Sequence, residues 1–242
     1  MHTFLDWHQW FLFFLRPQFD LLFPIEIEME PKDRLMAETE NNNNDDDDVK
    51  NEQRFLSIKS RLSLHPLEHC WVFWHYRRAR RRSTKKWMDC QRTLVEIDTI
   101  ESFWMFFAKQ RSPSMVRINQ DYALFKKGIK PMWEDPANMN GGQWIFILQK
   151  SQDNYDSVIN EIWYKIIMAM LGSIFKPEIM DQICGIVFSM RISCFTKISI
   201  WVNDYRAIKQ ILILGNELKR LTKFNDCIVF RRNDNMQTKF IL

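Results

Sequence analysis

After residue 60 the sequence alternates short runs of aromatic and β-branched residues with single stretches of helical periodicity. The aromatic and β-branched runs favour β-strands, and turn-forming residues such as Asn140-Gly141-Gly142 separate them. The strands predicted in this way are Trp71–Tyr76, Gln143–Leu148 and the ranges 184–190, 197–202, 226–231 and 237–241. The ranges 184–190 and 197–202 have the pattern of two paired strands.

Three segments have apolar residues at helical spacing. The first begins near Asp98, which stands three residues before Glu101 and so resembles a capping box. The second covers 157–171 with a wide apolar stripe and is expected to end at Gly172. The third covers 205–221 and has two cations in its last turn, where they suit the helix dipole. The apolar positions of the first helix are Ile100, Phe103, Trp104 and Phe107.

Strand pairs with short connections, separated by single helices, are typical of an antiparallel, curved sheet with helices packed on one face. The sequence therefore predicts an α+β fold. A length of 242 residues suits one globular domain with a tail. We expect an N-terminal extension over residues 1–60 and a folded domain over residues 61–242.

The N-terminal extension differs from the domain in charge. Residues 1–60 carry six basic and 13 acidic side chains, a net charge of −7, whereas residues 61–242 carry 28 and 17, a net charge of +11. The run of Asn and Asp at 41–48 cannot bury apolar area, so the extension is expected to be largely disordered. A positive domain favours polyanions, although charge alone does not distinguish nucleic acid from an anionic membrane.

Several classes of protein are disfavoured by the sequence. Five cysteines without a C-x-x-C pair argue against a disulfide framework and a zinc site, and they favour a reducing compartment. No apolar run reaches the ~18 residues that a membrane span needs, and no signal-peptide pattern is present. Motifs for nucleophilic catalysis, phosphate loops and metal sites are missing. We therefore expect a protein that is not an enzyme and that holds no metal or cofactor.

Two of the ten tryptophans lie where a core residue would be unusual. Trp87 follows the basic run at 77–86, and Trp133 lies between Pro131 and Pro136, so both are expected in loops. Exposed indoles suit a ligand that stacks on them. From composition alone, each could equally cover a surface patch of the core, and both interpretations stay open.

A series of motifs runs through the domain in a fixed order, and the most specific is Pro131-Met132-Trp133-Glu134-Asp135. The others are His65-Pro66-Leu67, 98–104, 121–126, 128–130, 140–144, 183–185 and 197–201. Together these motifs resemble the cap-binding translation initiation factor 4E family over roughly residues 62–242. The resemblance implies a mainly antiparallel sheet of about eight strands, with three helices on its convex face and a slot for the 7-methylguanosine cap of messenger RNA on its concave side.

The resemblance also implies how a cap would bind. Trp87 and Trp133 would sandwich the methylated guanine, whose positive charge adds a cation–π attraction of about 2 kcal/mol. Glu134 matches the residue that accepts hydrogen bonds from guanine N1 and N2, although a solvated loop carboxylate is the alternative. Trp201 matches the indole near the N7 methyl group, and two cations match those that hold the triphosphate. The implied cap-binding residues are Trp87, Met88, Trp133, Glu134, Arg191, Lys197 and Trp201.

The sequence departs from the family pattern beside the two cations. Ten steps separate Arg191 from Trp201, one more than usual, and Ser193-Cys194-Phe195 replaces a segment that normally carries another lysine. The C-terminal stretch after Trp201 is also short. We expect reduced cap affinity with a shallower salt dependence, because fewer phosphates are neutralised.

A second implied surface receives a short helical peptide from a scaffold initiation factor or an inhibitory binding protein. Its residues are His65, Pro66, Leu67, Ile100, Trp104, Tyr164, Lys165, Met168 and Gly172. By its spacing alone, Trp104 is a core residue of its helix. Lys165 stands where the family usually has an acidic residue, so a basic residue of the partner would be repelled.

The leading hypothesis is a monomeric cap-binding factor that acts in translation initiation by docking a scaffold. The alternatives are a cap-binding repressor or specialised paralogue with weak scaffold binding, and a protein-interaction module that has lost cap binding. We expect a cytoplasmic protein without a membrane partner. The basic run at 77–86 is a solvated loop, a nuclear-import signal or an RNA-binding strip, and the second interpretation would add a nuclear population.

Overall fold

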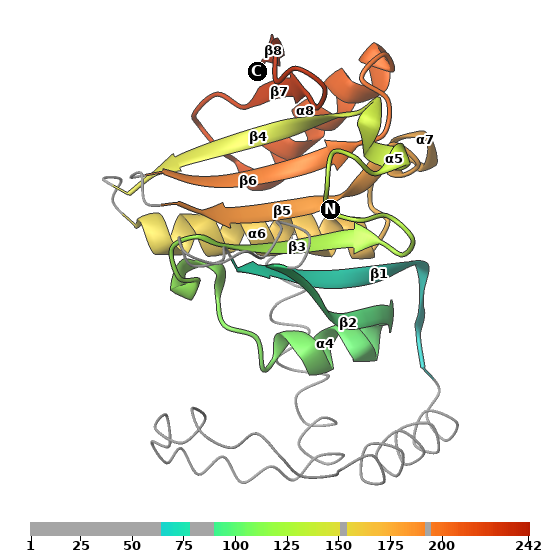
Figure 1. Cartoon of the computed structure of the whole chain (residues 1–242), viewed down its shortest axis with the longest axis vertical. Helices are drawn as coiled ribbons and strands as arrows, with labels where there is room; N and C mark the ends of the chain where they lie inside the picture. The colour runs from blue at the N-terminus through green and yellow to red at the C-terminus, as the bar shows by residue number, and fades with distance from the viewer. Residues whose placement is uncertain (1–63, 78–89, 151–153, 192–194) are drawn as a thin grey trace, which may run out of the picture. The chain divides into compact units, whose positions relative to one another are not determined.

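The computed structural model describes residues 64–77, 90–150, 154–191 and 195–242, and its strands form one eight-stranded antiparallel sheet (Figure 1). The strand order is β2-β1-β3-β5-β6-β4-β7-β8. The bounds are β1 Pro66–Arg77, β2 Gln91–Thr99, β3 Gln120–Lys126, β4 Gly142–Gln149, β5 Ile183–Met190, β6 Phe195–Val202, β7 Val229–Arg232 and β8 Thr238–Ile241. The predicted α+β class and the sheet of about eight strands are confirmed.

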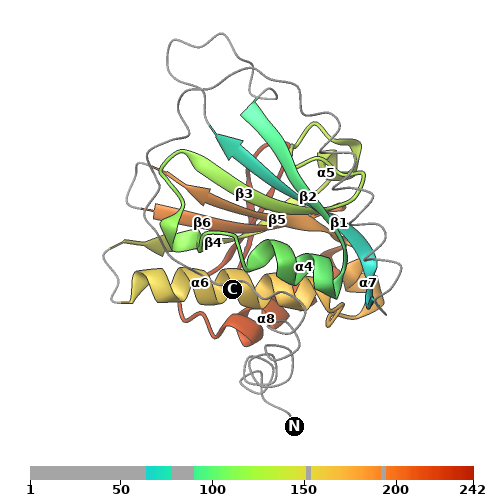
Figure 2. The ribbon, with the colours of Figure 1, turned by 90° about the horizontal axis from the view of Figure 1, so that it is seen from below.

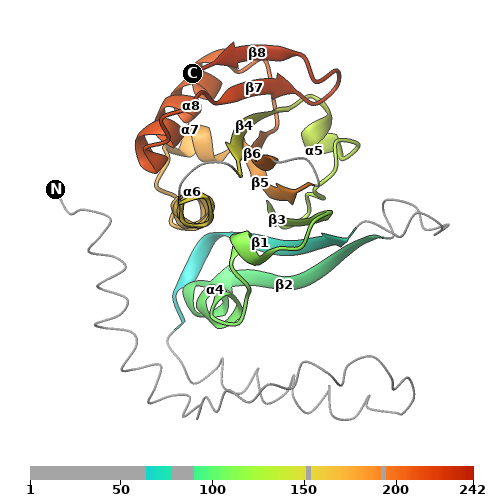
Figure 3. The same ribbon diagram turned by 90° about the vertical axis from the view of Figure 1, so that its left-hand side faces the viewer.

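Three longer helices lie on one side of the sheet, as the views in Figures 2 and 3 show. They are α4 Ile100–Phe107, α6 Tyr155–Leu171 and α8 Ile208–Thr222, and the shorter helices are η3 Pro113–Met115, α5 Pro136–Met139 and α7 Pro177–Met180. Helix α6 ends at Gly172, as predicted. Helix α8 begins three residues later than predicted, because the Asp204 carboxylate accepts a hydrogen bond from Arg206 N (2.9 Å) and holds a turn there.

The helices bury alternate residues of the central strands, because successive side chains of a strand point to opposite faces. On β4 the fully buried residues on the helix side are Trp144, Phe146 and Leu148. The ring of Trp163 on α6 lies 5.8 Å from that of Phe188 on β5. Trp144 Nε1 donates to Ile211 O (2.9 Å), which ties β4 to α8. The three longer helices do not cover the other face of the sheet.

Strands β2 and β3 were not identified by periodicity. Strand β3 is buried at every position from Tyr122 to Phe125, and a continuous apolar run has no period that distinguishes strand from helix. Strand β2 lies at the edge of the sheet and exposes three successive residues, Arg92 to Leu94, so its two faces do not alternate.

The N-cap of α4 is Thr99 and not Asp98, so the predicted capping box was wrong by one residue. Thr99 Oγ1 accepts a hydrogen bond from Ser102 N, and Ser102 Oγ accepts one from Thr99 N, both at 3.1 Å. Thr99 still has the extended conformation of β2 (φ −137°, ψ 159°), so the unpaired N–H groups of the helix start after it. The Glu101 carboxylate instead accepts hydrogen bonds from His65 N (3.1 Å) and His65 Nδ1 (2.7 Å).

The predicted boundary near residue 60, the extension over 1–60 and the Asn/Asp run at 41–48 lie outside the described residues. Within the described part, no helix has the length and apolar character to cross a membrane. Across the same ranges, no group of three or more His, Cys, Asp or Glu side chains is arranged to hold a metal ion.

Replacing Thr99 by Val keeps the volume of the side chain and removes the hydroxyl that caps α4. We expect the free energy of unfolding to fall by about 1 kcal/mol, the usual value of an N-cap hydrogen bond. Urea denaturation followed by tryptophan fluorescence measures this change. Thr99→Ser keeps the hydroxyl and serves as the matched control, and a Thr99→Val protein less stable by no more than Thr99→Ser would argue against the cap.

Candidate functional site

Three rows of residues cross the face of the sheet opposite the helices, because the strand registers bring them side by side. From β6 to β1 the rows are Lys197, Ser189, Asp121 and Tyr76; Ser199, Val187, Ala123 and Trp74; and Trp201, Gly185, Phe125 and Val72. Gln143 on β4 and Arg231 on β7 extend the third row beyond Trp201. Polar and aromatic side chains from six strands therefore share this face, which we call the open face.

The floor of the open face is apolar at its Trp201 end. Phe125 and Cys184 are buried there, and the rings of Phe125 and Trp201 meet edge to face at 5.8 Å. Burial raises the pKa of the Cys184 thiol to about 12, so the thiol is neutral. Gly185 lies between Phe125 and Trp201 in the third row. A glycine is required there, because a Cβ atom would lie 2.4 Å from Phe125 Cγ. The floor is thus a closely packed surface against which a flat, apolar group can lie.

The loop between β3 and α5 presents Trp133 to solvent, with 54% of the residue exposed, while the preceding Met132 is buried. Asp135 holds the loop by accepting hydrogen bonds from Lys130 N (2.9 Å) and Ala137 N (3.0 Å). The fully buried Asn138 donates to Lys130 O and Met132 O, both at 2.8 Å. The prediction that Trp133 projects from a loop is confirmed. The hydrogen bonds from Asp135 and Asn138 hold the backbone of this loop.

The two predicted cations have different surroundings. Arg191 makes a two-armed ion pair with Asp121, in which Nη2 lies 2.8 Å from Oδ2, and hydrogen bonding to this carboxylate raises the pKa of Arg191. Burial lowers the pKa of Lys197, and repulsion from Arg191 and Arg231 lowers it further, against the attraction of Asp121. Lys197 Nζ donates a hydrogen bond to a neutral group, Gln143 Oε1, at 3.2 Å. Lys197 is therefore the cation placed to attract an added anion.

Four polar atoms on the open face are buried without a hydrogen-bond partner among the described residues. They are Trp74 Nε1, Trp201 Nε1, Ser199 Oγ and Arg231 Nε. Buried donors are normally satisfied, so their grouping on one face beside Lys197 favours a polar, anionic ligand that would accept from some of them.

The structure describes five of the seven predicted cap-binding residues, among them Arg191, which pairs with Asp121 on the open face, and leaves two undescribed. Lys197 and Trp201 lie on the open face, Trp133 projects from the loop at its edge, and Glu134 follows as an exposed residue. Trp87 and Met88 lie outside the described residues. Sequence reasoning missed Asp121, Gln143, Asn138, Arg231 and Asn233. The alternation of side chains along β4 and β6 could have placed Gln143 on the same face as Trp201. No local sequence pattern identifies the other four residues.

The predicted partner-binding residues meet on the helix side. Ile100 N donates to His65 O (2.9 Å), which joins the start of β1 to α4, and Ile100 is 39% exposed. Although burial opposes it, hydrogen bonding from His65 lowers the pKa of Glu101. The rings of Phe107 on α4 and Tyr164 on α6 lie 6.3 Å apart, so the two helices form one surface. Leu67, Trp104, Tyr164 and Met168 are partly buried against the core, Pro66 begins β1, and Gly172 is exposed.

Comparison with known proteins gives one family. A family model described as "Eukaryotic initiation factor 4E" matches residues 66–240. Eukaryotic translation initiation factor 4E1 of Drosophila melanogaster is 35% identical over 173 residues, which cover 72% of this chain and 61% of that protein. Eukaryotic translation initiation factor 4E-3 of Caenorhabditis elegans is 33% identical over 171 residues, covering 70% of this chain and 66% of that protein. The matched part therefore spans less than two thirds of these two relatives.

Solved structures agree with this comparison. The complex of the C. elegans factor 4E-3 with the 4E-binding protein Mextli has a TM-score of 0.68 and 30% identity, over 74% of this chain and 100% of that one. The Ascaris suum factor 4E-3 with an m2,2,7G cap also has a TM-score of 0.68, with 29% identity, over 74% of this chain and 98% of that one.

Replacing Asp121 by Asn removes the carboxylate that occupies Arg191. We expect the affinity of the protein for inorganic triphosphate to rise by about fivefold at low salt, because a second cation becomes available. Isothermal titration calorimetry measures this affinity. Glu217→Gln removes an exposed carboxylate paired with Arg220 on α8 and should leave the affinity unchanged. Equal triphosphate affinities of Asp121→Asn and the unaltered protein would show that the ion pair does not limit anion binding.

Proposed function

This chain belongs to the eukaryotic initiation factor 4E family, and we propose on that premise that it binds the 7-methylguanosine cap of messenger RNA and acts in translation initiation. The proposal places the cap on the open face, with the base at the Trp201 end and the phosphates near Lys197. In this role the protein is a binding module and not an enzyme, and it acts as a monomer in the cytoplasm.

The exposure of Trp133 carries this proposal. A large aromatic side chain is seldom exposed on a loop that is itself held by buried hydrogen bonds, unless it meets a ligand. Methylation at N7 gives guanine a delocalised positive charge, so its ring gains a cation–π attraction to indole of about 2 kcal/mol when it is desolvated. Unmethylated guanine lacks this attraction, which makes the indole selective for the cap.

Charged groups supply the rest of the recognition. Glu134, adjacent to Trp133, can accept hydrogen bonds from guanine N1 and N2, which adenine does not offer. Lys197 would hold a phosphate together with the unpaired donors of the open face. Arg191 is already occupied by Asp121, which supports the expectation of a weaker phosphate contact than is usual in the family.

The proposal also includes a peptide partner on the surface formed by α4 and α6. The relative solved with the 4E-binding protein Mextli supports such a partner. An exposed Ile100 beside the partly buried Trp104 and Tyr164 is suited to the apolar side of a short helix. Lys165 pairs with Glu161, one helical turn earlier, so the positive charge expected to repel a basic partner is partly neutralised.

Tryptophan fluorescence measures cap binding, since stacking on indole quenches its emission. We expect saturable quenching by 7-methyl-GTP, at least tenfold weaker binding of GTP, and at least a tenfold loss of 7-methyl-GTP affinity in Trp133→Ala, as expected when about 2 kcal/mol of stacking is removed. Met115→Ala removes an exposed apolar side chain of η3 that belongs to neither proposed surface, and this control should leave the affinity unchanged. Absence of quenching by 7-methyl-GTP would refute cap binding and leave the peptide-binding surface as the function.

Replacing Lys165 by Glu restores the acidic character usual in the family. We expect the affinity for a helical scaffold peptide with a basic residue at the facing position to rise by about threefold to tenfold, and Glu161→Gln to lower it by unmasking Lys165. Fluorescence anisotropy of a labelled peptide measures both. Cap binding together with weak peptide binding that Lys165→Glu corrects would identify the protein as a repressor or specialised paralogue. An unchanged affinity in both variants would count against a role for this charge.

A further inference from the structure

A chain of buried amides runs from Lys197 on the open face to the loop that carries Trp133. Lys197 Nζ donates to Gln143 Oε1 (3.2 Å), and Gln143 Nε2 donates to Asn233 Oδ1 (3.2 Å). Asn233 Nδ2 then donates to the backbone oxygen of Asn138 (2.8 Å). Gln143, Asn233 and Asn138 are 3%, 7% and 0% exposed, so water does not compete for these hydrogen bonds. We call Gln143, Asn233 and Asn138 the amide chain.

The far end of the amide chain controls the backbone next to Trp133. Asn138 Nδ2 donates to Lys130 O and Met132 O, which lie on either side of Pro131. The reverse orientation of this amide would place its oxygen against both carbonyl oxygens, so the orientation is determined. Met132 is buried and the next residue, Trp133, is the exposed one, so a shift of these carbonyls moves the indole directly.

The amide chain has a fixed direction at both of its ends. A lysine ammonium only donates, so Gln143 must turn its oxygen towards Lys197 and its NH₂ group towards Asn233. At the other end, Asn233 must turn its NH₂ group towards the backbone oxygen of Asn138, which can only accept, and its own oxygen then accepts from Gln143. The ammonium has three N–H groups and can hold Gln143 and a phosphate at the same time. A bound phosphate would therefore restrain the same group that orients the Gln143 amide.

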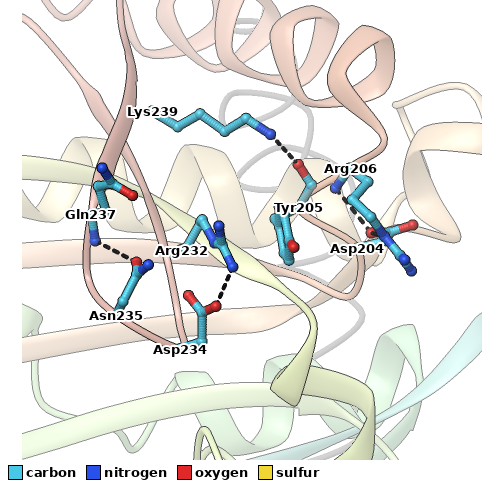
Figure 4. Close-up of polar contacts among 8 residues, drawn as sticks. All are labelled: Asp204, Tyr205, Arg206, Arg232, Asp234, Asn235, Gln237 and Lys239. Carbon is cyan, nitrogen blue, oxygen red and sulfur yellow. Dashed lines mark hydrogen bonds and ion pairs between the residues drawn. The ribbon is translucent and has the colours of Figure 1, made fainter.

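The middle of the amide chain has a rigid support. Asn233 begins the turn between β7 and β8, and Figure 4 shows how this hairpin is fastened to the segment before α8. Lys239 Nζ donates to Tyr205 O (3.0 Å), and the Arg232 guanidinium lies 3.9 Å above the Tyr205 ring and pairs with Asp234. Asn233 N also donates to Gly141 O (3.1 Å). These contacts hold the turn beside the start of β4.

We propose that the amide chain makes Lys197 a positioning residue for the base-binding loop, so that Lys197 strengthens binding of the methylated base even when the ligand has no phosphate. This inference rests on the proposed cap binding. Gln143, Asn233 and Asn138 are positioning residues as well, since they act on the ligand only through Trp133. Phosphate and base are then recognised cooperatively, although they contact different elements of the fold.

The test uses the full chain and two ligands, 7-methyl-GTP and the phosphate-free nucleoside 7-methylguanosine, with tryptophan quenching as the measurement. We expect Lys197→Met to weaken binding of the nucleoside by about fivefold, the effect of losing one buried hydrogen bond, and to weaken 7-methyl-GTP by more. Asn233→Asp keeps the shape of the side chain but removes the donor to Asn138, and it should weaken both ligands by the same factor. Lys209→Met removes an exposed cation of α8, outside the amide chain and its support, and should change neither affinity.

Three outcomes distinguish the possibilities. Loss of nucleoside affinity in Lys197→Met and Asn233→Asp, with thermal unfolding of Lys197→Met close to that of the unaltered protein, supports the inference. Unchanged nucleoside affinity in Lys197→Met overturns it, because Lys197 would then act on the phosphate alone. Failure of the unaltered protein to bind 7-methyl-GTP would refute the proposed function itself, which is a different result.

Discussion

Helix α6 buries Ile159, Trp163 and Ile166 against the side of the sheet that carries Trp144 and Phe188. This apolar contact excludes water from one face and leaves the other for a ligand, since successive residues of each strand point to opposite sides. Each residue of the open face therefore points away from the core because its neighbour along the strand points into it. Lys197 alternates with Ile198, and Trp201 with Ile200, both of which are fully buried.

The site joins a rigid floor with a loop that the fold has to hold in place. The floor needs only the strand registers and the missing side chain at Gly185. The loop has no strand partner along Pro131 to Glu134, so buried polar groups from other parts of the chain support it instead. Asn138 supplies the nearest hydrogen bonds, and the hairpin turn at Asn233 secures Asn138. An exposed aromatic side chain thus obtains a defined position from buried amides.

The two cations of the open face differ in how far their charge is neutralised. Arg191 is neutralised by Asp121 in a geometry that uses both arms of the guanidinium, whereas Lys197 faces a neutral amide and lies near two other cations. The pKa of Lys197 is lowered by burial and by this repulsion, and the attraction of an added phosphate would oppose both effects. The Ascaris suum factor solved with a cap matches this fold, and in this chain one of the two cations predicted to bind phosphate, Arg191, is already paired with a carboxylate.

The sequence by itself determined the features that depend on local pattern. These are the helix over 157–171 with its end at Gly172, six of the strands, and the exposure of Trp133 between two prolines. The family motifs added the order of the site residues. Only the tertiary structure decided that Asp121 occupies Arg191 and that Gln143 reaches Lys197, because these contacts join residues 70 and 54 positions apart. Periodicity tells which face of an element is buried, but the register between strands tells which side chains meet, and register is set by the packing of the whole sheet.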